Sequence, residues 1–154
     1  MKISIDVDNT KQDTEIKISC KSLTPEIEKI IAGITNITAG KIRSSLPVDC
    51  VPGTPDFLDM AFCGKWSGSA AELLKLCQEI EQQAGRPAKH SSRESRILDC
   101  DIIFFGNEVI EQPDLVIPHP RAQQRGFVLE ALNDIVPKKL FPNGKSVEQS
   151  LSEL

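Results

Sequence analysis

Two aspartates, Asp99 and Asp101, lie two positions apart in the largely apolar stretch RILDCDIIFFGNEVI, residues 96–110. Alternate residues of a β-strand point to the same face, so a strand here would place both carboxylates side by side. Close carboxylates on a half-buried face repel each other unless a metal, arginines or a shared proton compensates. Magnesium is commonly held by one or two carboxylates together with substrate phosphates. The pair is therefore a candidate metal site.

Cationic side chains surround this acid pair in the sequence. Arginine forks match phosphate oxygens bidentately, and acids beside arginines are typical of phosphoryl-transfer sites. Taken alone, however, a D-x-D pair is common on solvated strand ends and a basic loop is commonly a solvated linker, so the residue types name no substrate. The residues that precede the pair are Arg86, Lys89, Arg93 and Arg96, and those that follow it are His119, Arg121 and Arg125.

The patterning predicts the elements that would position these residues. Alternation or apolar runs predict strands, and spacing of three or four with N-caps at Thr24 and Ser69 predicts helices. In the strand expected from residue 97, one face should carry Leu98, Cys100, Ile102 and Phe104, and the other face Ile97, Asp99, Asp101 and Ile103. The strands are expected at 2–7, 15–20, 57–66 and from 97 to the Gly106–Asn107 turn, the helices at 23–34, 69–85 and 126–136, loops at 46–56 and 86–96, and a polar tail at the end.

This order of elements predicts the fold class. Helices and strands alternate, while the Gly106–Asn107 turn and short connections favour antiparallel pairing. We therefore expect an α+β domain with a ferredoxin-like β-α-β-β-α-β core, its sheet antiparallel or mixed and its helices packed mainly on the faces of the sheet. The length fits one domain over residues 1–154.

Composition excludes several classes of partner and site. The net charge of −4 and the pI near 5.2 give no global field for nucleic acid or an anionic membrane. No apolar stretch approaches the roughly 20 residues that span a bilayer, and the first residues lack a signal-peptide core. Five cysteines without a C-x-x-C pair, and only two histidines, argue against zinc and for reduced thiols. We expect a cytoplasmic protein, either a monomer or a weak dimer, with small-molecule substrates.

Four motifs in order carry a resemblance to a known family. They are QEIEQQAGR (78–86), RILDCDIIFFGNEVI (96–110), IPHPR (117–121) and RGFVLEAL (125–132), and FPNG (141–144) follows them. Residues 44–144 thereby resemble the 6-hydroxymethyl-7,8-dihydropterin pyrophosphokinases, the diphosphokinases of folate biosynthesis. The resemblance implies transfer of a diphosphate from ATP to the hydroxymethyl group of the pterin, with AMP as the second product and two Mg²⁺ ions as cofactors.

The resemblance also implies roles for individual residues. The catalytic residues would be Arg86, Arg96, Asp99 and Asp101. The two aspartates would also hold the two Mg²⁺ ions, and Arg96 would also bind the nucleotide. A flat heterocycle such as a pterin binds well between two aromatic rings, here those of Phe57 and Phe127. The remaining nucleotide-binding positions would be Gln78, Glu81, His119 and Arg125, and the pterin-binding positions Phe57, Asp59 and Phe127.

The chain departs from the family pattern in several places. Residues 1–43 match poorly, and ISCKSL (18–23) lacks the Gly and Asn of the family's Gly-Ser-Asn turn. Asp59 stands where the family usually has an asparagine at the pterin edge, and Arg93 replaces a tryptophan. One alternative is therefore a degenerate nucleotide-binding module without kinase activity. Another is a haloacid-dehalogenase-like phosphatase with Asp6 as nucleophile, because residues 6–10 fit D-x-D-x-T.

Overall fold

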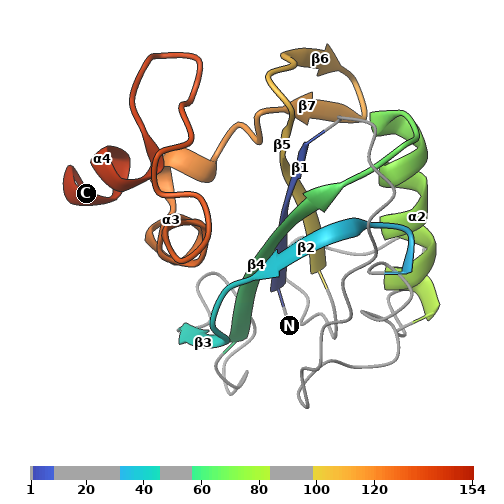
Figure 1. Cartoon of the computed structure of the whole chain (residues 1–154), viewed down its shortest axis with the longest axis horizontal. Coiled ribbons are helices and arrows are strands. Elements are labelled where there is room, and N and C mark those ends of the chain that lie inside the picture. Colours follow the sequence, from blue (N-terminus) through green and yellow to red (C-terminus); the bar gives the residue numbers. More distant parts are fainter. Residues whose placement is uncertain (1, 9–31, 46–56, 84–98) are drawn as a thin grey trace.

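The computed structural model describes residues 2–8, 32–45, 57–83 and 99–154. Figure 1 shows a central sheet with α2 on one side and α3 and α4 on the other. The elements are β1 Lys2–Asp8, β2 Thr35–Ala39, β3 Arg43–Ser45, β4 Phe57–Lys65, α2 Ala70–Gln83, β5 Asp99–Phe105, β6 Ile110–Gln112, β7 Leu115–Ile117, the 3-10 turn η1 Ala122–Gln124, α3 Gly126–Asn133 and α4 Val147–Ser152.

The main sheet is mixed, with the strand order β2-β4-β1-β5 and with β3 also paired to β4. β1 runs parallel to both β4 and β5, whereas β2 and β3 run antiparallel to β4. The α+β class and the mixed sheet are thus confirmed. An antiparallel ferredoxin-like sheet would have β1 running the other way. The expected antiparallel pairing rested on the Gly106–Asn107 turn, but that turn leads into the separate β6-β7 hairpin, and helix α2 provides the long connection that parallel strands need.

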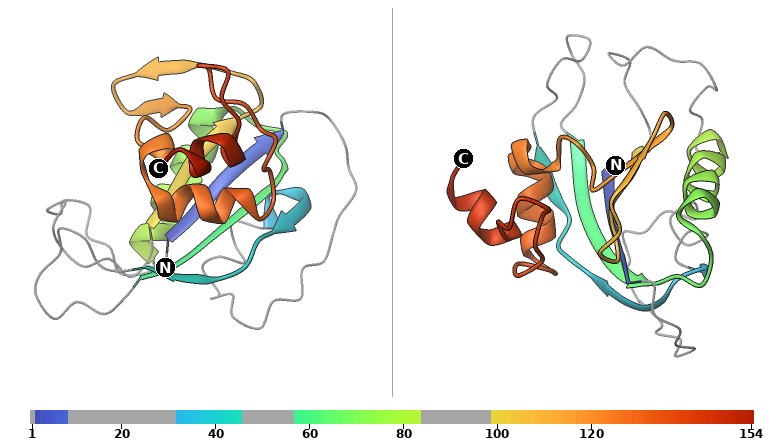
Figure 2. Two further views of the ribbon diagram at one scale, coloured as in Figure 1. Left: turned by 90° about the vertical axis from the view of Figure 1, so that its left-hand side faces the viewer. Right: turned by 90° about the horizontal axis from the view of Figure 1, so that it is seen from above.

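The sheet separates two apolar cores. The view from above in Figure 2 shows the helices on its two faces, α2 on one and α3 and α4 on the other. The core on the α2 side contains Met60 and Phe62 of β4. The core on the other side contains Ala61 of β4, together with the buried face of α3. Strand β4 therefore alternates strictly between the two cores, as a strand buried on both faces must.

Strand β5 breaks this alternation once. Cys100 and Ile102 face the α2 side and Ile103 the α3 side, as predicted. The register with β1 then skips Ile103, so Phe104 also packs on the α3 side and Phe105 turns to the α2 side. The prediction for Phe104 is wrong because a bulge adds one residue and reverses the alternation beyond it.

The helices follow their predicted caps and faces. The Ser69 hydroxyl accepts a hydrogen bond from the Glu72 amide at 3.1 Å, which confirms the cap of α2. Leu73, Cys77 and Ile80 are buried as expected. The predicted helix at 126–136 ends at Asn133 instead, consistent with Pro137, which disfavours helical geometry in the residue before it.

Several elements differ from the prediction or lie outside it. β2, β3, the β6-β7 hairpin and α4 were not expected, and α4 lies in the segment taken for a polar tail. Its N-cap is Ser146, whose hydroxyl accepts from the Gln149 amide at 3.1 Å. The strand expected at 15–20 and nearly all of the helix expected at 23–34 lie outside the described residues, as do the loops at 46–56 and 86–96.

Candidate active site

The two aspartates of the candidate metal site begin strand β5. Asp99 and Asp101 are both half-buried, and Cys100 between them is buried. Because Cys100 packs into the α2 core, the alternation of the strand turns both carboxylates to the α3 face. The structure therefore brings the predicted pair together on one face of the strand at one edge of the described sheet.

His119 faces this pair from the segment after β7. Its Nε2 lies 3.9 Å from Oδ2 of Asp101, and both side chains are about one-fifth exposed. The His119 amide donates to the Ile103 carbonyl at 3.0 Å, which ties this segment to β5. The Arg121 amide donates to Nδ1 of His119 at 3.2 Å. A nitrogen that accepts carries no proton, so neutral His119 has its proton on Nε2, facing the carboxylate.

Glu81 approaches the same strand from the opposite face. Its side chain, on α2, is only 7 % exposed, and its carboxylate accepts a hydrogen bond from the Cys100 amide at 3.1 Å. Gln78 lies one turn earlier on α2 and is exposed. Glu81 therefore contacts the backbone between the two aspartates, whereas Gln78 lies on the solvent side of the helix.

Beside Glu81, two thiols share the core between α2 and β5. A hydrogen bond with Cys77, followed by burial, raises the pKa of the Cys100 thiol. Both cysteines are buried, and neither forms a disulfide. The elevated pKa of Cys100 keeps its thiol protonated at neutral pH.

Asp59 lies two strands away from the pair on the same face. It belongs to β4, is 3 % exposed, and follows the alternation that turns Ala61 toward α3. In the register, Lys2 of β1 pairs with both Asp59 and Asp99, so the two aspartates flank β1 at one level. Neighbouring strands lie about 4.8 Å apart, which separates these backbones by roughly 10 Å.

The beginning of α3 contributes an aromatic ring and a cation to this face. The Arg125 guanidinium carbon lies 5.9 Å from the centre of the Phe127 ring, within the range of a cation–π contact. Phe127 is partly buried against the α3-side core. The other predicted residues cannot be placed in this way, because Arg86 and Arg96 lie outside the described residues, as does the side chain of Phe57.

One pair of charged residues near the site was missed by the sequence reasoning. Arg43 of β3 binds Asp134, at the end of α3, through two hydrogen bonds of 2.6 and 3.1 Å. The bound guanidinium lowers the pKa of the Asp134 carboxyl. The partners are 91 positions apart in the chain, and neither belongs to a motif that could have indicated the pairing.

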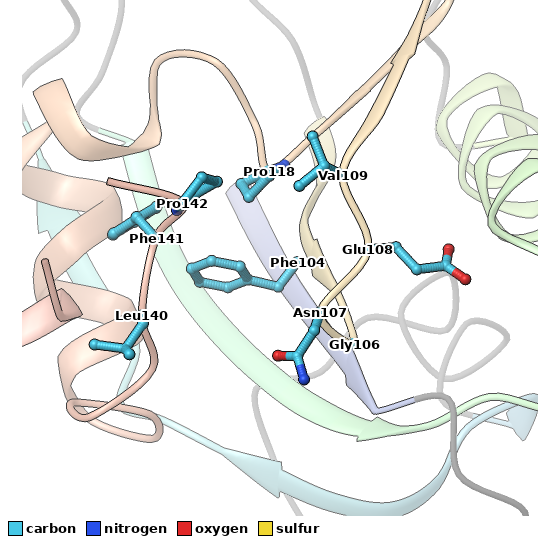
Figure 3. A pocket seen from close by; sticks show the side chains of 9 residues that line it. All are labelled: Phe104, Gly106, Asn107, Glu108, Val109, Pro118, Leu140, Phe141 and Pro142. Carbon is cyan, nitrogen blue, oxygen red and sulfur yellow. The ribbon is translucent and has the colours of Figure 1, made fainter. Parts of the chain in front are cut away.

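A small pocket lies beside the end of β5 (Figure 3), and neither aspartate of the acid pair lines it. It has a volume of about 180 Å³ and is found where β5 ends, whereas the aspartates lie where it begins. Its lining comes from Phe104, Gly106, Asn107, Glu108, Val109, Pro118, Leu140, Phe141 and Pro142. This lining holds only one ionisable side chain, that of Glu108.

The residues at the acid pair fit the binding of Mg²⁺. Their donors are carboxylate oxygens, the ligands that this ion prefers. Among the described residues, no group of three or more His, Cys, Asp and Glu side chains could hold a metal ion. A site with two protein carboxylates leaves coordination positions for water and substrate phosphates, as is usual for Mg²⁺.

Comparison with known proteins identifies the family. The model of the 7,8-dihydro-6-hydroxymethylpterin-pyrophosphokinase family matches residues 6–137. The chain belongs to this family. A 2-amino-4-hydroxy-6-hydroxymethyldihydropteridine pyrophosphokinase of Synechocystis is 38 % identical over 104 residues, 67 % of this chain and 53 % of the relative. One of Bacillus subtilis is 40 % identical over 102 residues, 64 % of this chain and 60 % of the relative.

A longer relative extends the comparison. A folate synthesis bifunctional protein of Chlamydia caviae is 33 % identical over 96 residues, which are 59 % of this chain and 22 % of the relative. The chain thus spans a little over half of the two shorter pterin pyrophosphokinases. No helix in the described ranges has the length and apolar character needed to cross a membrane.

Proposed function

We propose that this chain transfers a diphosphate group from ATP to 6-hydroxymethyl-7,8-dihydropterin. Its membership of the pterin pyrophosphokinase family and the names of its relatives, which are hydroxymethyldihydropteridine pyrophosphokinases, support the proposal. The pterin hydroxyl attacks the β-phosphorus of ATP, the bond from that phosphorus to the α-phosphate oxygen breaks, and AMP leaves. The hydroxyl proton is released to solvent or base. Family membership favours this reaction over the phosphatase alternative at Asp6.

The observation that carries the proposal is the grouping on the α3 face. Two carboxylates, an imidazole N–H and an arginine beside an aromatic ring come from β5, the segment after β7, and the start of α3. Phosphoryl transfer needs few covalent roles from the protein and relies on positioning and charge neutralisation. The carboxylates, through bound metal ions, the imidazole N–H and the arginine would bind a polyphosphate. The aromatic ring would stack on a flat heterocycle.

Asp99 and Asp101 would hold two Mg²⁺ ions, which neutralise the triphosphate and polarise its oxygens when bound. Nε2–H of His119 would donate a hydrogen bond to a phosphate oxygen, since the Arg121 amide holds this tautomer. Arg125 would bind the nucleotide with its guanidinium. Gln78, Glu81, Arg86 and Arg96 are the other proposed nucleotide-binding residues. Gln78 and Glu81 belong to α2, across β5 from the aspartates, and Arg86 and Arg96 are also the proposed catalytic arginines.

The pterin would bind between Phe127 and Phe57, with Asp59 at its edge. A flat heterocycle gains from aromatic stacking on both faces. An ionised aspartate only accepts hydrogen bonds, and the amino group and neighbouring ring N–H of a pterin are both donors. Asp59 can therefore replace the asparagine that the family usually has here, provided that its carboxylate is ionised.

We extend the proposal to the remaining properties of the chain. It forms a single domain with the ferredoxin-like strand order β2-β4-β1-β5, although the direction of β1 differs from that fold. It works in the cytoplasm as a monomer or weak dimer on small molecules, without nucleic acid or membrane. The acidic net charge supports the last point.

The test is AMP release with ATP, Mg²⁺ and 6-hydroxymethyl-7,8-dihydropterin. Wild type should form AMP only when the pterin is present. Replacing Asp101 with Asn should lower kcat about 10³-fold, because metal-ion catalysis is worth several kcal/mol. Asp114→Asn, on an exposed turn between β6 and β7, is the matched control and should keep wild-type activity. Pterin-independent ATP hydrolysis, or no AMP at all, would refute the proposal.

A further inference from the structure

We propose that Arg43 and Asp134 form a positioning pair, the Arg43–Asp134 clamp, that sets where α3 carries Phe127 over the pterin-binding part of the site. This inference rests on the function proposed above. The clamp joins the β2-β3 edge of the sheet to the last turn of the helix whose first turn carries the ring.

The clamp is a three-point attachment to one carboxylate. Nη2 of Arg43 donates to Oδ1 of Asp134 at 2.6 Å, and Nε donates to Oδ2 at 3.1 Å. The amide of Lys41 donates to the same Oδ2 at 3.3 Å. A fork of two parallel hydrogen bonds fixes orientation as well as distance, which a single contact does not.

The turn that supplies these donors also lies unusually close to the helix. A Cβ added to Gly40 would lie 3.0 Å from Cβ of Asp134 and 3.4 Å from the Ala131 carbonyl oxygen. The Gly40 amide donates to the Ala61 carbonyl at 2.8 Å, so the turn is itself anchored to β4. The end of α3 is therefore held at a set distance from the sheet, with no room for adjustment toward Gly40.

Because a short helix is rigid, fixing the C-terminal end of α3 also fixes the position of its N-terminal end, which carries Phe127. α3 has eight residues, and at 1.5 Å per residue it is about 12 Å long. Val128, Leu129 and Leu132 pack it against the sheet, but apolar packing alone is non-directional. A tilt of about 10° at the clamped end would move Phe127 by roughly 2 Å. Misplacement of about 1 Å can cost two orders of magnitude in rate.

The clamp also affects Asp59, which is the proposed contact to the edge of the pterin. Arg43 stands directly opposite Asp59 in the β3-β4 register, so the two side chains share a face. Its binding to Asp134 fixes where this cation lies relative to the buried Asp59 carboxylate. Asp99, Asp101 and His119 belong to β5 and the segment after β7, so the proposed metal site should not depend on the clamp.

The experiment compares substrate constants in Arg43→Lys and Asp134→Asn. Arg43→Lys keeps the charge and removes the fork, while Asp134→Asn keeps the shape and removes the charge. Each should raise KM for the pterin about tenfold, while the Mg²⁺ dependence, which is set by the aspartates of β5, changes less than about twofold. Glu153→Gln is the matched control, because Glu153 pairs with Lys145 at 2.5 Å, the two residues flank α4, and the change should leave every constant unchanged.

A second variant tests position without changing charge. Gly40→Ala should push the end of α3 away and raise the pterin KM in the same direction, and this variant carries the test if Asp134→Asn fails to fold. A lower Tm with an unchanged pterin KM would overturn the clamp and leave a merely structural ion pair. Wild type that forms no AMP would instead overturn the function, and the clamp proposal with it.

Discussion

At the scale of single residues, the site depends on which ring nitrogen of His119 carries the proton. The Arg121 amide donates to Nδ1 of His119, and this contact is independent of any ligand. The imidazole therefore offers a donor, not an acceptor, toward Asp101. Because the tautomer is already set, the imidazole does not have to reorganise when a phosphate oxygen binds.

We predict that neutral His119 is the Nε2–H tautomer in the ligand-free protein. Long-range ¹H–¹⁵N correlation spectra of the imidazole should show an unprotonated Nδ1, and Asp101→Asn should leave this pattern unchanged because the backbone amide sets it. Observation of the Nδ1–H tautomer as the major form would contradict the assigned hydrogen bond.

The sequence predicted the placement of some of these residues and not of others. D-x-D spacing in a strand was sufficient to put Asp99 and Asp101 on one face, because alternation is a local rule. The contact of His119 with Asp101 depends on how the chain returns after the β6-β7 hairpin, which no local pattern encodes. Glu81 also fell outside local reasoning, since its partner is a backbone amide on another element.

At the scale of elements, α2 and β5 are joined by the Glu81 carboxylate. We predict that Glu81→Ala lowers the free energy of unfolding by about 1–3 kcal/mol, because the Cys100 amide loses a buried acceptor. Glu81→Gln keeps an acceptor oxygen and should cost less than about 1 kcal/mol. Urea denaturation of both variants provides the measurement, and equal losses in the two would argue that charge, not the hydrogen bond, matters here.

The ends of elements were predictable where a capping residue or a proline marks them. The prediction failed where pairing with a distant strand decides whether an element forms. Ser69 gave the start of α2, whereas the short strands β2 and β3 form only because β4 lies beside them. The bulge in β5 is likewise a property of its pairing with β1, and it moves Phe104 to the other core. Ser146, three residues before Gln149, was a capping signal for α4 that the sequence reasoning overlooked.

At the scale of the whole molecule, the Arg43–Asp134 clamp links the edge of the sheet to α3 and makes stability depend on pH. The guanidinium lowers the pKa of Asp134 from its ordinary 3.8. A carboxyl with a depressed folded pKa stabilises the fold fully above its unfolded pKa, and this contribution is lost as pH falls through the folded value. Acid should therefore weaken the attachment of α3.

We predict that Asp134→Asn lowers the free energy of unfolding at pH 7, and that its difference from wild type shrinks steadily below about pH 4. Urea denaturation from pH 2.5 to 7 measures both curves. Glu153→Gln serves as comparison, since Lys145 also lowers the pKa of Glu153. That pair is more exposed, and solvent screening should make its effect smaller. A constant difference for Asp134→Asn across this range would contradict the linkage.

The central claim is that Asp99 and Asp101 hold divalent metal together with the phosphates of a nucleotide. Calorimetric titration of the protein with a non-hydrolysable ATP analogue, with and without Mg²⁺, tests it most directly. Wild type should bind the analogue at least about tenfold more tightly with Mg²⁺, and Asp99→Asn and Asp101→Asn should lose this gain while remaining folded. Mg²⁺-dependent binding that survives both substitutions would contradict the claim.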